Sequence, residues 1–418
     1  MKKYLVGGAV RDMILGKEPH DKDYVIVGST PEEMVSLGYK HVGKDFPVFL
    51  DEAGNEYALA RTERKSGLKH TDFEFDFNPE ITLEQDLFRR DFTVNSIAYD
   101  EETKEFIDPY NGIEDIKNKI LRVTNPKAFK DDPLRVLRMA RFYAQLNFAI
   151  EESTLQLAKE TIAEGCLKNL TPERIFNEIE KAAYTVRFAD FIHILHEIDG
   201  LKDILPEIEK LYEVPENPKY HIEKNTGEHI ERVIQSLNTD TIKLNLAALF
   251  HDVGKSVTPK EDYPHHKSHD ILGIDLIKNI SKRLKIPNEY KDFCVYIYKN
   301  HDKFRYVNDM KLSKLYDFVR ELTNKFKDDL LRGKISFSEE NKNFFFKSAD
   351  HPNCKLTLSV EDGNLVITYY IGDNVYTKRV PLDSSDFADK SSGEFWRKYG
   401  EIIISSSNEL VAQINGGH

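Results

Sequence analysis

YLVGGAVRDMILGKEPHDKDYVIVG, residues 4–28, is the stretch that decides the fold of the N-terminal part of this chain. An apolar run at residues 4–6 predicts a buried strand, the glycine pair after it predicts a tight turn, and residues 9–15 predict a helix. At such a turn, backbone N–H groups can approach a phosphate closely. Gly8 is therefore a candidate phosphate contact, and Arg11 can add a bidentate one. A plain tight turn is the alternative interpretation.

The second half of this stretch carries two closely spaced carboxylates. Asp21-Lys22-Asp23 leads directly into the apolar run at residues 24–27, which predicts a strand. Residues i and i+2 of a strand point to the same face, so Asp21 and Asp23 are predicted to lie side by side. Two such carboxylates repel each other unless a cation lies between them, and oxygen ligands suit Mg²⁺. The pair therefore predicts a magnesium site, with a solvated turn as the alternative.

Length and composition restrict the class of protein. A chain of 418 residues has room for two to four domains, and 40% apolar with 31% charged residues is typical of a soluble globular protein. No apolar stretch approaches the roughly 20 residues that span a bilayer, so no membrane contact is expected. The three cysteines form no CxxC pair, and without an export signal they indicate the cytoplasm. The net charge of −12 argues against a general nucleic-acid coat but permits a local basic groove.

Basic residues gather at three further places. Residues 132–141 predict a helix with proline in its first turn, on which arginines recur every three residues and share one face. An exposed basic stripe is the alternative there, and a surface ion-pair network is the alternative for Arg89-Arg90-Asp91. The basic cluster is predicted to contact RNA or a triphosphate, with a solvated loop as the alternative; it consists of Arg61, Arg64, Lys65 and Lys69.

A second constellation combines histidines with carboxylates. An apolar run at residues 244–250 ends in His251-Asp252-Val253-Gly254-Lys255, with His229 upstream and His301-Asp302 downstream. Between them lie three more histidines, His265, His266 and His269. Imidazole and carboxylate ligands together suit a transition metal or another divalent cation. The constellation therefore predicts a metal site, and it resembles the pattern of the HD-domain phosphohydrolases; the alternative is a degenerate HD fold that only packs.

The motifs together resemble a known family. GGAVRD followed by DKD is similar to the polymerase-β-type nucleotidyltransferases, and residues 1–318 resemble the class II tRNA nucleotidyltransferases, the CCA-adding enzymes, most of all the bacterial members that carry an HD domain. The motifs that carry this resemblance, in chain order, are VGKDFPVFL (42–50), EYALARTERKSG (56–67), DLFRRDFTVNSIAYD (86–100), DPYNGIEDIKNKILR (108–122), DDPLRVLRMARF (131–142) and LTPERIFNE (170–178).

The resemblance implies an α+β multidomain fold. A nucleotidyltransferase palm, with helices on a mixed sheet, is expected over residues 1–142, and a helical neck and body over residues 143–224. An all-α HD domain is expected over residues 225–332. Residues 333–418 lie outside the resemblance, and three β-rich runs separated by turn residues predict a small β-rich module there. A module that binds an unknown partner is the interpretation for that segment.

The resemblance also assigns roles to residues of the head. Asp21 and Asp23 would hold the catalytic Mg²⁺, while Gly8 and Arg11 would orient phosphates and sugar. No third catalytic carboxylate is named from the sequence. The remaining nucleotide-binding assignments are Arg90, Asp132, Arg135, Arg138 and Arg141.

Asp132 and Arg135 are implied to read the incoming base. Cytosine and adenine both present an amino donor beside a ring-nitrogen acceptor, which match a carboxylate and a guanidinium. Guanine and uracil reverse that pattern and leave buried polar groups unpaired, at a cost of about 1–3 kcal/mol. The family motif EDxxR has Asp131 at its first position here, and little effect is expected because the reading pair is intact.

For the HD site the resemblance implies four ligands. The metal would be a divalent transition metal such as Ni²⁺, or Mg²⁺, and it would activate water for phosphoester cleavage. His301 is an alternative to the fourth ligand. The implied ligands are His229, His251, Asp252 and Asp302.

The expected function is template-independent addition of CCA to tRNA 3′ ends from CTP and ATP, together with an HD-domain phosphodiesterase or phosphatase activity. An A-adding enzyme or a poly(A) polymerase of the same superfamily is the alternative within the class. An RNA-binding or partner-binding protein with a relic head is the alternative from another class. A third alternative is that only the HD hydrolase matters physiologically.

Overall fold

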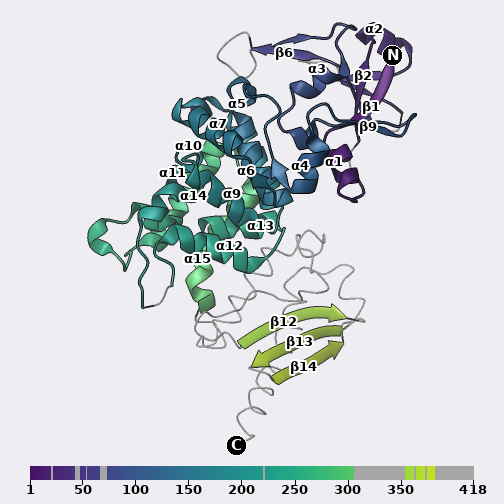
Figure 1. The fold of residues 1–418 in the computed structure, drawn as a ribbon. Helices are drawn as coiled ribbons and strands as arrows, with labels where there is room; N and C mark the ends of the chain where they lie inside the picture. The colour runs from purple at the N-terminus through teal and green to yellow at the C-terminus, as the bar shows by residue number, and fades with distance from the viewer. Residues whose placement is uncertain are drawn as a thin grey trace, which may run out of the picture. The chain divides into compact units, whose positions relative to one another are not determined.

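The computed structural model describes residues 1–19, 22–42, 48–52, 54–65, 73–219, 222–305, 354–361, 364–371 and 374–381. Side chains are described for all of these except residues 63–65, 73–75, 301–305 and, apart from Arg379, the three C-terminal strands. The chain divides into two compact units, residues 1–298 and 299–418 (Figure 1). The finer domain boundaries expected within these units stay predictions.

A seven-stranded mixed sheet forms the centre of the N-terminal part. Its strand order is β3-β4-β5-β2-β1-β8-β9, and the only parallel pair among these seven strands is β2 with β5. The mixed sheet of the expected palm is thus confirmed. The bounds are β1 (Lys2–Val6), β2 (Asp23–Val27), β3 (Lys40–Val42), β4 (Val48–Leu50), β5 (Glu56–Leu59), β8 (Ala98–Asp100) and β9 (Glu105–Ile107).

Four short helices accompany this sheet: α1 (Gly8–Ile14), α2 (Pro31–Ser36), α3 (Leu83–Phe88) and α4 (Gly112–Asn118). Both α2 and α3 begin at a threonine, Thr30 and Thr82, that forms a capping box. The threonine hydroxyl accepts from the backbone N–H of the third helical residue, Glu33 or Gln85. The side chain of that residue accepts in return from the backbone N–H of the threonine. The start of each helix is therefore fixed locally. The head is the name used below for β1 to β9 with α1 to α4; it includes the hairpin of β6 (Thr62–Lys65) and β7 (Phe73–Asp76).

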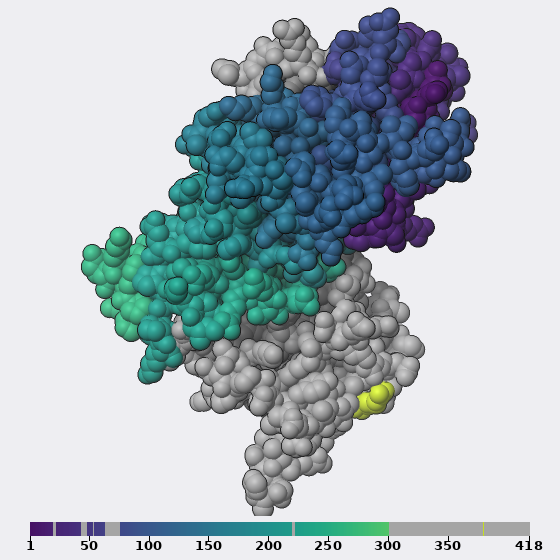
Figure 2. Space-filling view, in the orientation of Figure 1, coloured from purple at the N-terminus to yellow at the C-terminus, as the bar shows by residue number. Residues whose placement is uncertain are grey.

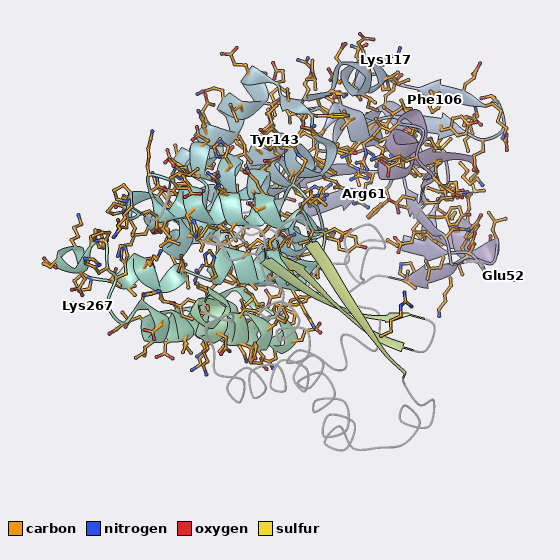
Figure 3. All side chains as sticks on the ribbon, turned by 90° about the horizontal axis from the view of Figure 1, so that it is seen from below. Glu52, Arg61, Phe106, Lys117, Tyr143 and Lys267 are labelled. Carbon is orange, nitrogen blue, oxygen red and sulfur yellow. The ribbon has the colours of Figure 1, made fainter. Side chains whose placement is uncertain are left out.

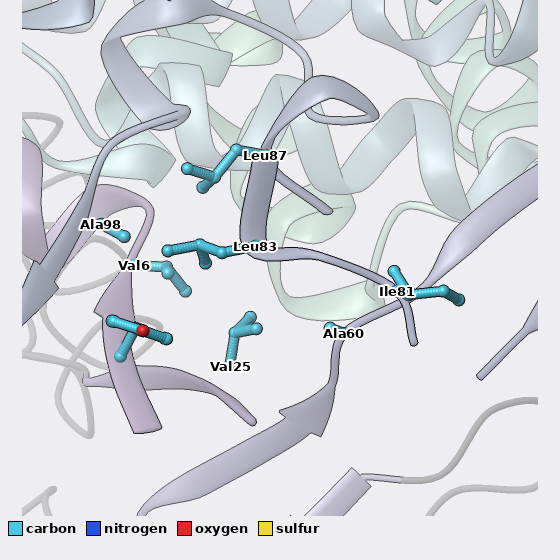
Figure 4. Close-up of a cluster of buried hydrophobic side chains, with 8 residues drawn as sticks. Val6, Val25, Ala60, Ile81, Leu83, Leu87 and Ala98 are labelled. Carbon is cyan, nitrogen blue, oxygen red and sulfur yellow. The ribbon is translucent and has the colours of Figure 1, made fainter. Parts of the chain in front are cut away.

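Helix α3 closes one core of the head. Leu83 and Leu87 lie one turn apart on it and pack over side chains from β1, β2 and β8 (Figure 4). Burial of such side chains stabilises the fold by about 1.5–3 kcal/mol each. This packing fixes the residues just after α3, which include Arg89 and Arg90. The buried members of the cluster are Tyr4, Val6, Val25, Ala60, Ile81, Leu83, Leu87 and Ala98.

Helices make up most of the rest of the first unit, and in Figure 2 the coloured residues of the head and of these helices form one continuous surface. A two-stranded parallel sheet, β10 (Ile120–Leu121) with β11 (Ala149–Ile150), lies beside the start of the helices. Helix α6 packs on α8 and α9, and α12 packs on α9 and α13. The first group is α5 (Ala128–Asp131), α6 (Leu134–Leu146), α7 (Glu152–Ala163), α8 (Pro172–Ala183), α9 (Phe188–Glu197), α10 (Leu201–Ile204) and α11 (Pro206–Glu209).

The second group of helices carries the HD motif. It consists of α12 (Thr226–Leu237), α13 (Ile242–Phe250), α14 (His269–Leu284) and α15 (Asn288–Arg305). Short 3₁₀ turns connect the helices, among them η3 (Lys210–Glu213) before α12 and η4 (Val253–Val257) after α13. Among the described residues, no helix has the length and apolar character that crossing a bilayer requires.

The second unit contains an antiparallel meander. Strands β12 (Cys354–Glu361), β13 (Asn364–Ile371) and β14 (Asn374–Pro381) pair in sequence order. The residues between the paired strands are Asp-Gly (362–363) and Gly-Asp (372–373), dipeptides that favour tight hairpins. The predicted β-rich character of this segment is confirmed, while its predicted partner stays a prediction.

Candidate functional site

One end of the central sheet gathers the candidate catalytic carboxylates of the head. Val6, the last residue of β1, pairs with Asp23, the first residue of β2. The parallel partner of Asp23 on β5 is Glu56. Residues in register on neighbouring strands point to the same face, so these two exposed side chains lie next to each other. Asp21 lies outside the described residues, so its predicted pairing with Asp23 stays a prediction.

Glu56 is the residue that sequence reasoning missed at this end of the sheet. It opens the alternating run EYAL, which indicates a strand but says nothing about the strand beside it. Only the parallel register between β2 and β5 brings it to Asp23. Carboxylate oxygens are the donors that Mg²⁺ prefers, so the donor set at this end fits a magnesium ion.

Gly7 is the glycine that the turn after β1 requires. Its backbone angles, φ 73° and ψ −139°, belong to a region that is essentially restricted to glycine. A Cβ atom there would also lie 3.2 Å from Nη1 of Arg90. Gly8 begins α1, where a Cβ atom would make only an ordinary contact with Arg11. The turn therefore brings the predicted nucleotide ligand Arg90 against Gly7, while the role predicted for Gly8 stays a prediction.

Arg90 is oriented by a buried carboxylate. Its Nη2 lies 3.1 Å from Oδ2 of Asp86, and Nη2 of Arg89 lies 2.7 Å from Oδ1. Burial opposes ionisation of Asp86, but the two arginines hold the pKa of its carboxyl group below the usual range. The Nε of Arg90 is buried and has no hydrogen-bond partner in the described part of the chain. A guanidinium whose Nη1 lies against the Gly7 turn fits an anionic ligand such as a phosphate.

Arg11 is buried rather than displayed. Its Nη1 donates to Oδ1 of Asn95 over 2.9 Å, and its Nε and Nη2 donate to Oδ1 of Asp12 over 2.9 and 2.8 Å. Only 5% of the residue is exposed. The side chain therefore joins α1 to the turn η1 (Thr93–Asn95), and the direct phosphate contact predicted for Arg11 stays a prediction.

The predicted base-reading residues are each held by a different partner. Oδ2 of Asp132 accepts from Nη2 of Arg174 over 2.7 Å. Nη2 of Arg135 donates to the carbonyl oxygen of Arg89 over 2.6 Å. Asp132 and Arg135 are thus oriented from α8 and from the end of α3, while their role in choosing a base stays a prediction.

The remaining arginines of α6 point into the protein. Nε of Arg138 donates to Oδ2 of Asp91 over 2.7 Å, and Nε of Arg141 donates to Oε2 of Glu178 over 2.6 Å. Burial raises the pKa of Asp91, but Arg138 and Arg135 outweigh it and hold that pKa well below the usual range. The alternative of an exposed basic stripe is wrong for Arg141, because only 7% of that residue is exposed. Nucleotide contact by Arg138 and Arg141 stays a prediction.

Part of the predicted basic cluster can be placed. Arg61 is half-buried where β5 leads into β6, and its backbone N–H donates to Oδ1 of Asp86 over 3.3 Å (Figure 3). Arg64 and Lys65 lie on β6, where only the backbone is described, and Lys69 lies outside the described residues. The hairpin that carries the cluster thus begins beside the carboxylate that orients Arg90.

Three of the four predicted HD ligands come together. His229 lies on α12, His251 follows α13, and one potential ligand atom from each, with one from Asp252, lies within 4.8 Å of the others. Nε2 of His251 is 3.3 Å and Nε2 of His229 is 3.9 Å from Oδ2 of Asp252. Two imidazole nitrogens and a carboxylate oxygen fit a divalent transition metal.

Local contacts prepare both histidines as ligands. Nδ1 of His251 donates to the carbonyl oxygen of Ala248 over 2.8 Å, which leaves Nε2 to bind a cation. Burial, together with the neighbouring His251, lowers the pKa of His229 to about 4. His229 is therefore neutral near pH 7 and offers a nitrogen lone pair.

The histidine-rich turn before α14 adds a further side chain to this centre. Nδ1 of His269 donates to the carbonyl oxygen of His266 over 2.8 Å, and Nε2 of His269 lies 4.0 Å from Oδ1 of Asp252. His266 is buried and bonds to Thr258 over 2.8 Å. Lys267, between them, points outward at the edge of the helices (Figure 3). His269 therefore faces the oxygen of Asp252 opposite to the one that faces His229 and His251.

The fourth predicted ligand cannot be placed. Asp302 and its alternative His301 lie on α15, and their side chains are outside the described residues. Both therefore stay predictions.

Close packing requires glycine at position 254 of the HD motif. A Cβ atom on Gly254 would lie 2.2 Å from Oη of Tyr298 and 2.2 Å from the carbonyl oxygen of His269. A Cβ atom on Gly273 would lie 2.0 Å from the same phenol. The two glycines thus form the notch that receives Tyr298 and draws α14, with His269, against η4.

Comparison with known families divides the chain in the same way. Residues 3–122 match the family described as the poly A polymerase head domain, and residues 221–322 match the HD domain. Residues 147–211 match the family described as the probable RNA and SrmB-binding site of polymerase A.

Curated relatives match most of the chain. The multifunctional CCA protein of Xylella fastidiosa (strain 9a5c) is 45% identical over 324 residues, which cover 76% of each chain. That of Methylobacillus flagellatus is 41% identical over 355 residues, which cover 81% of this chain and 86% of the relative.

Solved structures share the fold. The Bacillus stearothermophilus CCA-adding enzyme in complex with CTP matches with a TM-score of 0.54 and 24% identity, over 80% of this chain and 74% of that one. The Thermotoga maritima CCA-adding enzyme complexed with tRNA matches with a TM-score of 0.52 and 23% identity, over 81% and 75% of the two chains. At this identity the likeness supports the fold alone.

Proposed function

The chain belongs to the family of multifunctional CCA proteins, and we propose that its head adds C, C and A to tRNA 3′ ends from CTP and ATP with release of pyrophosphate. The observation that carries this proposal is the placement of Arg90. Its Nη1 lies against the Gly7 turn, which follows β1 at the end where Val6 pairs with Asp23, the first residue of β2. A triphosphate donor site next to carboxylates is the arrangement that nucleotidyl transfer needs.

In the proposed reaction the carboxylates would bind the metal ion and Arg90 would bind the triphosphate. Asp21 and Asp23 would hold Mg²⁺, and Glu56 would complete the set from the neighbouring strand. When bound, Mg²⁺ supplies Lewis acidity toward the phosphates and the attacking 3′-hydroxyl. Arg90 would bind the triphosphate.

Base choice would come from Asp132 and Arg135. A carboxylate accepts from the amino group that cytosine and adenine share, and a guanidinium donates to the adjacent ring nitrogen. Arg174 and the carbonyl oxygen of Arg89 fix the two groups, so neither has to be ordered when the nucleotide arrives. This arrangement supports acceptance of both CTP and ATP.

The partners follow from this reaction. Solved structures that share the fold include CCA-adding enzymes complexed with CTP and with tRNA, and a tRNA nucleotidyltransferase complexed with a primer tRNA and an incoming ATP analogue. The tRNA 3′ end, CTP and ATP are the proposed ligands of this head.

The test is incorporation of labelled CTP and ATP into tRNA that ends at the discriminator base, followed by sequencing of the product end. A product that ends in CCA supports the proposal. Addition of A alone would move the chain to the A-adding alternative, and no Mg²⁺-dependent incorporation would favour the relic head.

We propose a second activity for the HD centre, the metal-dependent hydrolysis of small phosphoesters or RNA ends. The observation that favours it is the convergence of His229, His251 and Asp252, with Asp302 as the proposed fourth ligand. Such a ligand set fits Ni²⁺ or another divalent transition metal, and Mg²⁺ less well. When bound, such an ion lowers the pKa of a coordinated water.

This second activity is tested with bis-p-nitrophenyl phosphate and p-nitrophenyl phosphate as diester and monoester probes. Chelator-treated protein should be inactive and should recover on addition of Ni²⁺. Activity that ignores chelator, or that survives Asp252→Asn, would contradict the assignment.

A further inference from the structure

A buried glutamate outside the HD motif bonds directly to its lysine. Glu216 lies in the segment between η3 and α12 and is only 6% exposed. Its Oε1 lies 2.7 Å from Nζ of Lys255 and accepts from Oγ1 of Thr226, also over 2.7 Å. Glu216 thus connects the HDVGK turn to the first residue of α12, the helix that carries His229.

Lys255 is also bonded to the metal-binding carboxylate. Its Nζ lies 3.0 Å from Oδ2 of Asp252. This is the same oxygen that lies nearest Nε2 of His229 and Nε2 of His251. An ammonium group and a divalent cation therefore compete for one carboxylate oxygen.

Glu216 settles this competition electrostatically. An ammonium paired only with Asp252 would neutralise the carboxylate and repel an incoming cation. A second carboxylate bonded to the same ammonium balances the lysine charge, so that Asp252 keeps its own charge for the metal. The lysine distances agree with this division, because the bond to Glu216 is the shorter of the two.

The backbone around Glu216 holds it in this place. Its N–H donates to the carbonyl oxygen of Lys224 over 3.3 Å, and the N–H of Thr226 donates to the carbonyl oxygen of Val214 over 2.9 Å. Pro215 and Asn225 form a β-bridge between these bonds. The segment is therefore fixed against the start of α12 rather than free to follow the lysine.

We propose that Glu216 is a positioning residue of the HD centre, which draws the Lys255 ammonium away from Asp252 and so leaves Oδ2 of Asp252 to a divalent cation. The inference rests on the proposed metal-dependent activity of this centre. Once the cation is bound, the ammonium of Lys255 is placed to attract the phosphate of a phosphoester substrate.

The test is titration of the full chain with Ni²⁺ by calorimetry, after chelator treatment, in five variants. E216A should weaken binding by about tenfold or more, the range found when residues around metal ligands are removed. E216Q should lose less, because the amide oxygen still accepts from Thr226 and Lys255. E216A/K255M should regain most of the affinity, since the competing ammonium is gone. K255M completes the cycle, and E213A, which removes an exposed glutamate three residues away, should bind like the wild type.

Thermal melts and CCA addition on the same preparations report folding separately. An E216A that folds and binds Ni²⁺ as tightly as the wild type would overturn the inference, as would an E216A/K255M that stays weak. If E216A does not fold, E216Q and E216Q/K255M carry the same comparison, and loss of the ammonium must then tighten binding. A wild-type chain that binds no Ni²⁺ would overturn the proposed HD activity and this inference with it.

Discussion

The two centres of the first unit use buried carboxylates in opposite ways. In the head, Asp86 holds Arg90, whose Nη1 lies against the Gly7 turn, and Asp91 holds Arg138 of α6. In the HD centre, one carboxylate, Asp252, faces His229 and His251 and shares Lys255 with Glu216.

The difference shows what each centre is built to bind. Two arginines that share one carboxylate, as Arg89 and Arg90 share Asp86, keep a net positive charge in a fixed place, which suits a triphosphate. A carboxylate whose lysine partner is also paired with a second carboxylate, as Asp252 is through Lys255 and Glu216, keeps its negative charge, which suits a metal ion. Sequence motifs identify the candidate ligand residues in both centres. Their buried partners decide whether the centre presents a positive charge to a phosphate or a negative charge to a metal ion.

The largest effect on activity should come from a substitution in the proposed Mg²⁺ site of the head. Asp23→Asn removes a charged oxygen from the proposed Mg²⁺ site and should lower CCA addition by about a thousandfold. The rate is measured by single-turnover incorporation of CTP. Glu52→Gln, a change at an exposed residue of the head, is the matched control and should be silent. An active Asp23→Asn would remove the basis for placing the metal there.

The next largest effect concerns the stability of the HD centre, where Gly254 packs against Tyr298. Gly254→Ala places a methyl group on a carbonyl oxygen and a phenol that both lie 2.2 Å away, so it should destabilise the fold by about 3 kcal/mol. Urea unfolding measures the loss. Gly16→Ala, where nothing lies within 4 Å, is the control for backbone strain alone and should cost about 1 kcal/mol. Equal losses in the two variants would contradict the Tyr298 notch.

Much of this could be predicted from the sequence, and the limits have a physical cause. The strand, turn and helix of residues 2–14 and the three C-terminal strands depend on short-range pattern and turn chemistry, which a sequence displays. Glu56 and Glu216 depend on register and on contacts between distant segments. No local pattern marks them, because a glutamate in a strand or loop is ordinarily a solvated residue.

Arg141 is a residue whose position on the helix could be predicted from the sequence but whose burial could not. Its spacing on α6 correctly placed it on the face of Arg135 and Arg138. The spacing could not show that α8 covers this face with Glu178, which turns an apparent surface charge into a buried ion pair. Which face of a helix is covered is a tertiary property.

A smaller effect concerns the buried pair of the head. Asp91→Asn should destabilise the fold by about 2 kcal/mol at pH 7, because Arg138 loses its charged partner. The folded pKa of Asp91 lies below the unfolded value of about 3.9, so this stabilisation is present above pH 4 and is lost as the pH falls toward the folded pKa. The difference in stability between wild type and variant should therefore be constant above about pH 5 and shrink as the pH falls below about 4. A gap that does not change with pH would contradict the ion pair.

The smallest effect tests the basic hairpin. The affinity for tRNA should fall steeply with salt, because phosphate contacts release counterions. Lys65→Ala should reduce the slope of log affinity against log salt by about one unit or less. Lys267→Ala, at the outer edge of the helices, should leave the slope unchanged. A flat salt response of the wild type would exclude a phosphate-gripping groove.

The most direct test of two separate centres is to assay both activities in Asp23→Asn and Asp252→Asn prepared side by side. The account predicts a crossed result: Asp23→Asn loses CCA addition and keeps Ni²⁺-dependent phosphoester hydrolysis, and Asp252→Asn does the reverse. If either substitution abolishes both activities in a protein with an unchanged thermal melt, the two centres do not work independently and the account is wrong.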